Sequence, residues 1–251
     1  MTIDVDKAGD VAVLRLAHGK ANAMDTELCR ELVARLEDAE LGDAKAVVLT
    51  GRDGMFSAGV DLKRITAGGP AYVREFLPAL SDAFLAVFGF PGPVVAAVTG
   101  HAIAGGAVLA AACDRRVLNA RQGRVGVTEL LVGVPFPLVA LEILRCAYGT
   151  ERLPGLTFLG GTYAGEEALA LGLVDELAEP DAVLPAAIET AQRLAAVPAD
   201  VYRHTKAQIH RPFDERIGEQ RAGDDMFVER VWASPPVQAA IEDYTRTTLR
   251  G

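Results

Sequence analysis

The sequence has few of the residues that build metal centres and disulfide frameworks. Its 251 residues include three cysteines and four histidines. Cys29, Cys113 and Cys146 are widely spaced and form no C-x-x-C pair, so we expect neither a metal site nor a disulfide framework. This cysteine usage is typical of a protein from a reducing compartment.

Long apolar runs and a secretory leader are also missing. No stretch reaches the roughly 18 consecutive apolar residues that a membrane helix needs. The first residues, M-T-I-D-V-D-K, lack the basic start and the apolar core of a signal peptide. We therefore predict a soluble, cytoplasmic protein without a membrane span.

Positive charge is scarce. Lysine and arginine together number 25 against 34 acidic residues, which gives a formal net charge of −9. This balance argues against a nucleic-acid partner, so a few cations or backbone amides would have to bind any anionic ligand. Half of the residues are hydrophobic, which at this length predicts one large α/β domain or two small ones.

Three well-known active-site motifs do not occur. The spacing of Gly100, Gly105 and Gly106 does not fit the dinucleotide-binding fingerprint, and no P-loop ending in G-K-[ST] is present. The nucleophile elbow G-x-S-x-G fails by one position, because Gly54 lies three residues before Ser57. We therefore interpret Ser57 as a turn residue rather than a nucleophile.

The most informative stretch that is present spans residues 98–114, V-T-G-H-A-I-A-G-G-A-V-L-A-A-A-C-D. An apolar run at 93–98 predicts a strand before it, and residues 107–113 favour a helix. The glycine-rich turn between them would leave backbone N–H groups free for a phosphate, a carboxylate or a developing oxyanion. Alternatively, the glycines serve only close packing of helix and sheet.

The rest of the chain alternates strands and helices and then turns helical. We expect strands at 3–5, 11–16, 46–50 and 115–119, an irregular loop at 51–61, and short extended pieces at 125–132. Helices are expected at 26–40, 61–65, 72–88 and 138–148 and, with no further strands past Gly149, at 150–157, 165–171, 183–196, 201–210, 216–231 and 236–249. This order predicts one α/β core with a helical C-terminal region.

A second glycine-bearing exit from a strand lies at residues 57–60, S-A-G-V. In a parallel sheet both exits would lie on the same carboxyl edge, where α/β proteins bind their ligands. Two amides that converge on one carbonyl oxygen would stabilise an enolate or a tetrahedral oxyanion. One such donor is worth about 3–4 kcal/mol in acyl-transfer enzymes.

Five motifs follow one another along the chain: V-V-L-T-G at 47–51, F-S-A-G-V-D-L-K at 56–63, P-V-V-A-A-V-T-G-H-A-I-A-G-G at 93–106, G-V-T-E-L-L-V-G at 126–133 and A-G-E-E-A-L-A-L-G-L-V-D at 164–175. Together they resemble the crotonase superfamily of enoyl-CoA hydratases and isomerases, from about residue 11 to about residue 210. The resemblance implies an α/β spiral of ββα units at 1–195 with an acyl-CoA site, and a helical trimerisation region at 196–251. It also implies a homotrimer or a dimer of trimers. Coenzyme A would be part of the substrate rather than a cofactor.

By the same resemblance, the N–H groups of Val60 and Gly105 would hold the thioester oxygen. The segment 60–63 would lie along coenzyme A, with Lys20 and Lys63 as candidates for its phosphates. For each lysine, a solvated surface charge is an equal alternative. The predicted substrate-binding residues are Lys20, Ala21, Ala58, Val60, Asp61, Leu62, Lys63, Gly105, Val108 and Phe136.

The family's hydratases place two glutamates around one water, as general acid–base chemistry requires. One of these positions falls on Glu129, but the other falls on Val108, which cannot exchange a proton. The following V-P-F-P at 134–137 removes backbone donors and adds apolar bulk. These departures favour a Δ3,Δ2-enoyl-CoA isomerase of fatty-acid metabolism, in which Glu129, its pKa raised by apolar neighbours, moves a proton from C2 to C4.

Other functions stay open at this point. A hydratase would need a second acid, for which Glu142 is the nearby candidate. A chain that kept the fold and lost the chemistry would be a non-catalytic acyl-CoA binding protein, and decarboxylation or thioester hydrolysis are further reactions of the fold. We assign His204 and His210 to a solvated face or a subunit contact, and Trp232 and Phe227 to packing between subunits.

Overall fold

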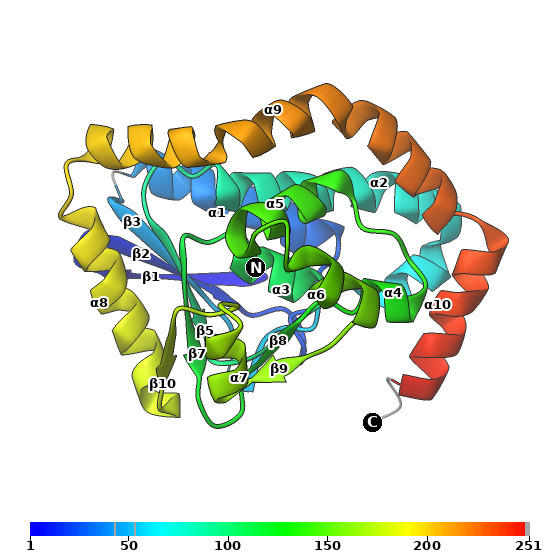
Figure 1. The fold of residues 1–251 in the computed structure, drawn as a ribbon, viewed down its shortest axis with the longest axis horizontal. Coiled ribbons are helices and arrows are strands. Elements are labelled where there is room, and N and C mark those ends of the chain that lie inside the picture. The colour runs from blue at the N-terminus through cyan, green and yellow to red at the C-terminus, as the bar shows by residue number, and fades with distance from the viewer. Residues whose placement is uncertain (43, 53, 249–251) are drawn as a thin grey trace.

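The computed structural model describes residues 1–42, 44–52 and 54–248. Asp53 in the predicted loop 51–61 and Leu249 in the predicted helix 236–249 therefore lie outside the described residues. A six-stranded sheet forms the centre of the fold (Figure 1), in the order β1-β2-β3-β5-β7-β10. Its first two strands are antiparallel and all later neighbours are parallel. The strands are β1 (Ile3–Ala8), β2 (Val11–Leu16), β3 (Ala46–Thr50), β5 (Val94–Val98), β7 (Arg115–Asn119) and β10 (Glu176–Ala178).

The middle strands of this sheet are covered on both faces. Every residue of β3 and β5 is buried, as expected for valine-rich parallel strands. One face packs on α8 (Val183–Ala195), and the other faces the main core beneath α1 (Thr26–Leu41) and α3 (Gly105–Ala111). The two faces of these strands are therefore closed to a ligand.

A second, smaller sheet has the order β4-β6-β8-β9. In it β4 (Gly54–Ser57), β6 (Gly100–Ile103) and β8 (Arg124–Gly126) are parallel, and β9 (Tyr163–Ala164) is antiparallel. Strand β4 lies where an irregular loop was predicted at 51–61, and β6 lies within the predicted glycine-rich turn. Neither strand was predicted, because strands this short show no clear alternation of apolar and polar residues. The prediction of helices alone past Gly149 is also wrong, since β9 and β10 lie there.

Two of the early helices begin at aspartate caps. The Asp25 carboxylate accepts a hydrogen bond from the Leu28 amide at 2.8 Å at the start of α1, and Asp61 accepts one from the Arg64 amide at 3.1 Å at the start of α2 (Leu62–Phe88). α2 runs through the predicted break with a kink at Gly69, where φ is 56°. The remaining short helices are α4 (Glu129–Val132), α5 (Leu138–Tyr148), α6 (Leu153–Leu159), α7 (Gly165–Ala170) and the 3-10 turn η1 (Pro180–Ala182).

The C-terminal helices wrap around this core (Figure 1). α9 (Ala199–Trp232) is a single helix that packs on α5 and α2, where two helices were predicted. Pro212 inside it removes a backbone donor, and α9 bends along its length (Figure 1). α10 (Pro235–Thr248) then returns to pack on α2. Within the described part of the chain, no helix combines the length and apolarity needed to traverse a bilayer.

Candidate active site

Two loops leave the smaller sheet side by side. β4 and β6 are parallel neighbours that end at Ser57 and Ile103, so their carboxyl ends face the same way. The loops are in contact, because a Cβ atom placed on Gly59 would lie 2.8 Å from the Ile103 carbonyl oxygen and 2.9 Å from the Gly105 nitrogen. Gly59 also has a φ of 83°, a conformation that favours glycine. The structure therefore brings together the two loops that carry Val60 and Gly105.

The amides of Val60 and Gly105 are free to bind a ligand. Across residues 1–42, 44–52 and 54–248, neither amide nitrogen donates to a backbone carbonyl. Gly105 is the first residue of α3, a position whose N–H has no partner within the helix. Both residues line one cavity, so the two N–H groups can converge on one oxygen atom.

The backbone before Gly105 is strained. Ala104 has a φ of 50°, a conformation that costs a residue with a side chain about 1–3 kcal/mol. Hydrogen bonds hold it in place: its N–H donates to the Gly126 carbonyl at 2.8 Å, and its carbonyl accepts from the Ala107 amide at 2.8 Å. Gly106 leaves no room for a side chain, because a Cβ atom there would lie 2.2 Å from the Ser57 carbonyl oxygen. Strain of this kind is typical of a functional loop.

Ser57 supports the first loop instead of facing the cavity. It is fully buried. Its hydroxyl donates to the Asn22 carbonyl at 2.7 Å and accepts from the Gly59 amide at 3.2 Å. The side chain thus fixes the loop that presents Val60, in keeping with its interpretation as a structural residue.

A cavity of about 660 Å³ lies in front of the two amides. One part of its wall is polar and includes His18, Lys20 and Lys63, and another part is apolar and includes Leu80 and Phe84 of α2. All the predicted substrate-binding residues line it except Phe136, which is buried elsewhere while Pro137 reaches the wall. The lining residues predicted from the sequence are Lys20, Ala21, Ala58, Val60, Asp61, Leu62, Lys63, Gly105 and Val108.

Glu129 projects from the first turn of α4 into this cavity, where the sequence suggested an extended segment. Its side chain is buried, and its Oε2 atom has no hydrogen-bond partner among the described residues. Burial raises the pKa of Glu129 to about 8, and backbone N–H groups of Glu129 and Thr128 offset this only in part. A buried carboxyl group with a pKa near neutrality can act as a general base.

This raised pKa predicts a stability penalty at high pH. In the unfolded chain Glu129 ionises near its ordinary pKa of 4.5, but in the folded protein only near 8. Between these two pH values the folded protein therefore binds one proton more than the unfolded chain. The free energy of unfolding therefore falls as pH rises from about 4.5 to about 8, at about 1.4 kcal/mol per pH unit for this group. We expect Glu129→Gln to remove this loss and to be on the order of 5 kcal/mol more stable than the parent at pH 9. Urea unfolding of both proteins at pH 5 and pH 9 measures the difference, and equal pH dependence would contradict the assignment.

The structure excludes Glu142 as the second acid of a hydratase. Glu142 lies on α5, is 1% exposed, and is ion-paired with Arg145 and, at 2.8 Å, with Arg216. It does not line the cavity. The other carboxyl group on the cavity wall is Asp61, which caps α2 beside the lysines.

Among the residues of the cavity wall that sequence reasoning missed are two from the C-terminal helices. Trp232, at the end of α9, is 2% exposed and lines the cavity, as does Tyr244 on α10. The prediction that Trp232 packs between subunits is therefore wrong for this residue, whereas Phe227 is 52% exposed. The only signal in the sequence was that a helical tail carries the chain's single tryptophan, and no local pattern could tell where that tail folds.

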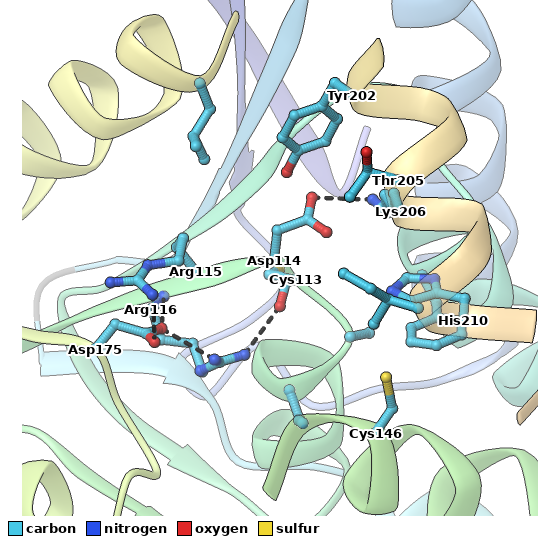
Figure 2. Close-up of a pocket in the computed structure, with 16 residues that line it drawn as sticks. Cys113, Asp114, Arg115, Arg116, Cys146, Asp175, Tyr202, Thr205, Lys206 and His210 are labelled. Atoms are coloured by element: carbon cyan, nitrogen blue, oxygen red, sulfur yellow. Dashed lines mark hydrogen bonds and ion pairs between the residues drawn. The ribbon is translucent and has the colours of Figure 1, made fainter. Parts of the chain in front are cut away.

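A second cavity, of about 340 Å³, lies beneath the start of α9 (Figure 2). Its charged groups pair with one another: Lys206 lies 2.9 Å from Asp114, and Arg116 lies 3.0 Å from Asp175. His210 stacks on the ring of Phe88 and burial lowers its pKa to about 4. These contacts anchor α9 to the amino edge of the central sheet. Of the two alternatives predicted for His210, the solvated face is therefore wrong, and the subunit contact stays a prediction. In the described ranges, no three His, Cys, Asp or Glu side chains are grouped to hold a metal ion.

Known proteins are similar to this chain in sequence and in fold. The model of the enoyl-CoA hydratase/isomerase family matches residues 6–248. A probable enoyl-CoA hydratase of Mycobacterium avium is 34% identical over 230 residues, which cover 90% of this chain and 88% of that protein. A putative enoyl-CoA hydratase of Thermus thermophilus is 37% identical over 209 residues, 81% of each chain. The crystal structure of human mitochondrial Δ3-Δ2-enoyl-CoA isomerase matches with a TM-score of 0.94 and 26% identity, and covers 100% of both chains.

These likenesses confirm the resemblance to the crotonase superfamily and the predicted α/β fold class with long C-terminal helices. The similar proteins carry the names of two reactions, hydration and isomerisation. The reaction must therefore be argued from the residues of the cavity.

Proposed function

The chain belongs to the enoyl-CoA hydratase/isomerase family, and we propose that it is a Δ3,Δ2-enoyl-CoA isomerase. The observation that carries this proposal is a single buried carboxyl group, Glu129, on a cavity wall that also presents the free amides of Val60 and Gly105. The place of a second acid is taken by Val108, which is 1% exposed and cannot carry a proton. One base and one oxyanion hole suffice to move a double bond.

The proposed reaction transfers one proton within the substrate. The Glu129 carboxylate removes a proton from C2 of a 3-enoyl-CoA, and the electron pair of that C–H bond delocalises into a dienolate. The negative charge develops on the thioester oxygen, where the N–H groups of Val60 and Gly105 stabilise it. The protonated Glu129 then returns the proton to C4 as the C2–C3 double bond forms, and the carboxylate is regenerated.

The polar part of the cavity suits the coenzyme A part of such a substrate. Lys20 and Lys63 line it together with His18, and the phosphates of coenzyme A are anionic. His18 is held by a 2.6 Å contact between its Nε2 atom and the buried Asp25 carboxylate. Because the whole chain has a net charge of −9, the local positive charges of Lys20 and Lys63 are what would attract a polyanionic ligand.

An assay with two substrates tests the proposal. Purified protein is incubated with trans-3-hexenoyl-CoA and, separately, with crotonyl-CoA, and the absorbance of the 2-enoyl thioester is followed. An isomerase increases the absorbance with the first substrate and does not decrease it with the second. Silence with both substrates would favour a non-catalytic acyl-CoA binding protein or another reaction of the fold.

Hydration is the second candidate, because relatives that are 34% and 37% identical are named as enoyl-CoA hydratases. It would require a second proton-exchanging group near C3. Val108 occupies the wall beside Gly105, and Glu142 is held in ion pairs away from the cavity. Loss of crotonyl-CoA absorbance in the assay above would establish hydration and refute our interpretation of Val108.

The raised pKa of Glu129 predicts how isomerisation depends on pH. The base works only when ionised, and with a pKa of about 8 about a tenth of the free enzyme is ionised at pH 7. We expect kcat/KM to rise about tenfold per pH unit up to pH 8 and then to level off. Initial rates measured from pH 6 to pH 9.5 check this, and a profile that is already flat above pH 5 would mean that Glu129 has an ordinary pKa.

We further propose that the protein assembles as a homotrimer or a dimer of trimers and works in the cytoplasm. Support for assembly comes from exposed apolar side chains on two neighbouring helices, Leu130 and Leu131 on α4 and Phe158 and Leu159 on α6. Apolar surface of this kind is typical of a protein contact. Sedimentation velocity of the purified protein gives the number of chains.

A further inference from the structure

The cavity changes in character along its length. Lys63 lies in the first turn of α2, and Phe84 lies near the other end of the same helix. The oxyanion amide borders the apolar part, since a Cβ atom on Gly105 would lie 3.7 Å from the ring of Phe84. A thioester held at Gly105 would therefore direct coenzyme A towards the lysines and its acyl tail towards Leu80 and Phe84.

Trp232 lines the cavity as a fixed group. Its side chain is 2% exposed, and its indole N–H donates to the Pro135 carbonyl at 3.0 Å. Its own carbonyl accepts a hydrogen bond from the Gln238 side chain at 2.7 Å. A buried tryptophan that is tied at both the indole and the backbone cannot move aside easily.

Among the residues that the structure describes, none in the apolar part could neutralise a charged tail. The charged or titratable lining residues other than Glu129 are His18, Lys20, Asp61, Lys63 and Tyr244, and the first four belong to the part that faces coenzyme A. A tail ending in a carboxylate would be buried without a counter-charge, which is strongly unfavourable.

From this arrangement we infer that Trp232 closes the acyl end of the cavity and limits the protein to uncharged alkyl tails below a set length. The inference rests on the proposed function, because it takes an acyl-CoA as the ligand. It assigns Trp232 as a specificity-determining residue. The C-terminal helices of the chain would thus shape the site of the same chain, in addition to any role in assembly.

The experiment uses Trp232 as its own probe, since it is the only tryptophan in the chain. Free coenzyme A and saturated butanoyl-, octanoyl-, dodecanoyl- and hexadecanoyl-CoA are titrated into the full-length protein, with tryptophan emission and calorimetry as readouts. We expect free coenzyme A to leave the emission unchanged, and the first tail that reaches the indole to shift it. Affinity should rise about fourfold per methylene up to that length and then stop rising or fall. Octanedioyl-CoA should bind at least tenfold more weakly than octanoyl-CoA.

Two variants sharpen the test. Trp232→Ala should restore the gain in affinity for hexadecanoyl-CoA, by at least tenfold relative to octanoyl-CoA, as measured by calorimetry. Trp232→Phe keeps most of the wall and should retain the length limit, which covers the case in which Trp232→Ala does not fold. Phe227→Ala, on the same helix but 52% exposed, should bind every ester like the parent.

The outcomes separate this inference from the proposed function. If esters bind but their affinity rises steadily to hexadecanoyl-CoA without a change in emission, Trp232 is not the end wall and the inference is wrong. An emission change of the same size with free coenzyme A would refute it as well. If the esters bind with the expected length limit but no isomerisation occurs, the inference stands and the isomerase proposal falls. If no ester binds, both fall.

Discussion

Replacing Glu129 with glutamine is expected to lower kcat for trans-3-hexenoyl-CoA by about 10²- to 10⁴-fold, the usual contribution of a positioned general base. The amide has nearly the shape of the carboxyl group but cannot accept the C2 proton. Because Glu129 is neutral below a pKa of about 8, the substitution also changes little in the charge of the resting site at pH 7. Affinity for a saturated acyl-CoA should therefore stay within a few fold of the parent. Initial rates and calorimetry give the two quantities.

A matched control for this variant is Glu142→Gln. Glu142 is buried like Glu129, at 1% against 9% exposure, but it is bound to Arg145 and Arg216 away from the cavity. We expect this variant to lose stability, because a buried ion pair loses one partner, and to keep kcat near that of the parent in the folded fraction. Unchanged turnover in Glu129→Gln, or an equal loss in both variants, would refute the role given to Glu129.

The long periodic elements could be predicted from the sequence. Strands β2, β3 and β7 and helix α5 begin and end where their apolar patterns predict, because each buries a continuous face. Strands β4 and β6 could not be found in this way, since four residues around a glycine carry too little pattern. They matter most for the site, because the loops that follow them present Val60 and Gly105. Their glycines located these loops where periodicity could not, and the family resemblance assigned the two amides in them.

The residues of the candidate site also include some that the sequence predicts and some that it does not. Residues near the glycine-rich motifs, such as Lys63, Gly105 and Glu129, were identified in advance and line one cavity. Trp232 and Tyr244 were not identified, because they reach the cavity only through the packing of α9 and α10 on helices far away in the sequence. A helix pattern shows which face is apolar but not which distant partner that face meets. Residues brought in by long-range packing are thus the part of a site that local sequence signals do not show.

The role of the Gly105 amide can be tested by removing its N–H group as a hydrogen-bond donor. Gly105→Pro removes the N–H group, which has no partner within the helix because Gly105 is its first residue. Loss of one oxyanion donor is expected to lower kcat by about 10²- to 10³-fold. Gly105→Ala is the matched control. It keeps the N–H group, and its Cβ atom would contact the Met24 sulfur at 3.4 Å and the Phe84 ring at 3.7 Å, which are ordinary packing distances.

The comparison of these two variants separates a change at the Gly105 nitrogen, where proline replaces the N–H group with a ring CH2 group, from the space that a Cβ atom occupies. We expect Gly105→Ala to turn over trans-3-hexenoyl-CoA within a few fold of the parent and Gly105→Pro to lose most activity, while thermal melts show that both fold. Because the ring CH2 group of proline also lies where the thioester oxygen would approach the Gly105 nitrogen, Gly105→Pro should weaken binding of saturated acyl-CoA as well as lower kcat. Equal turnover in the two variants would mean that the Gly105 amide does not stabilise the oxyanion.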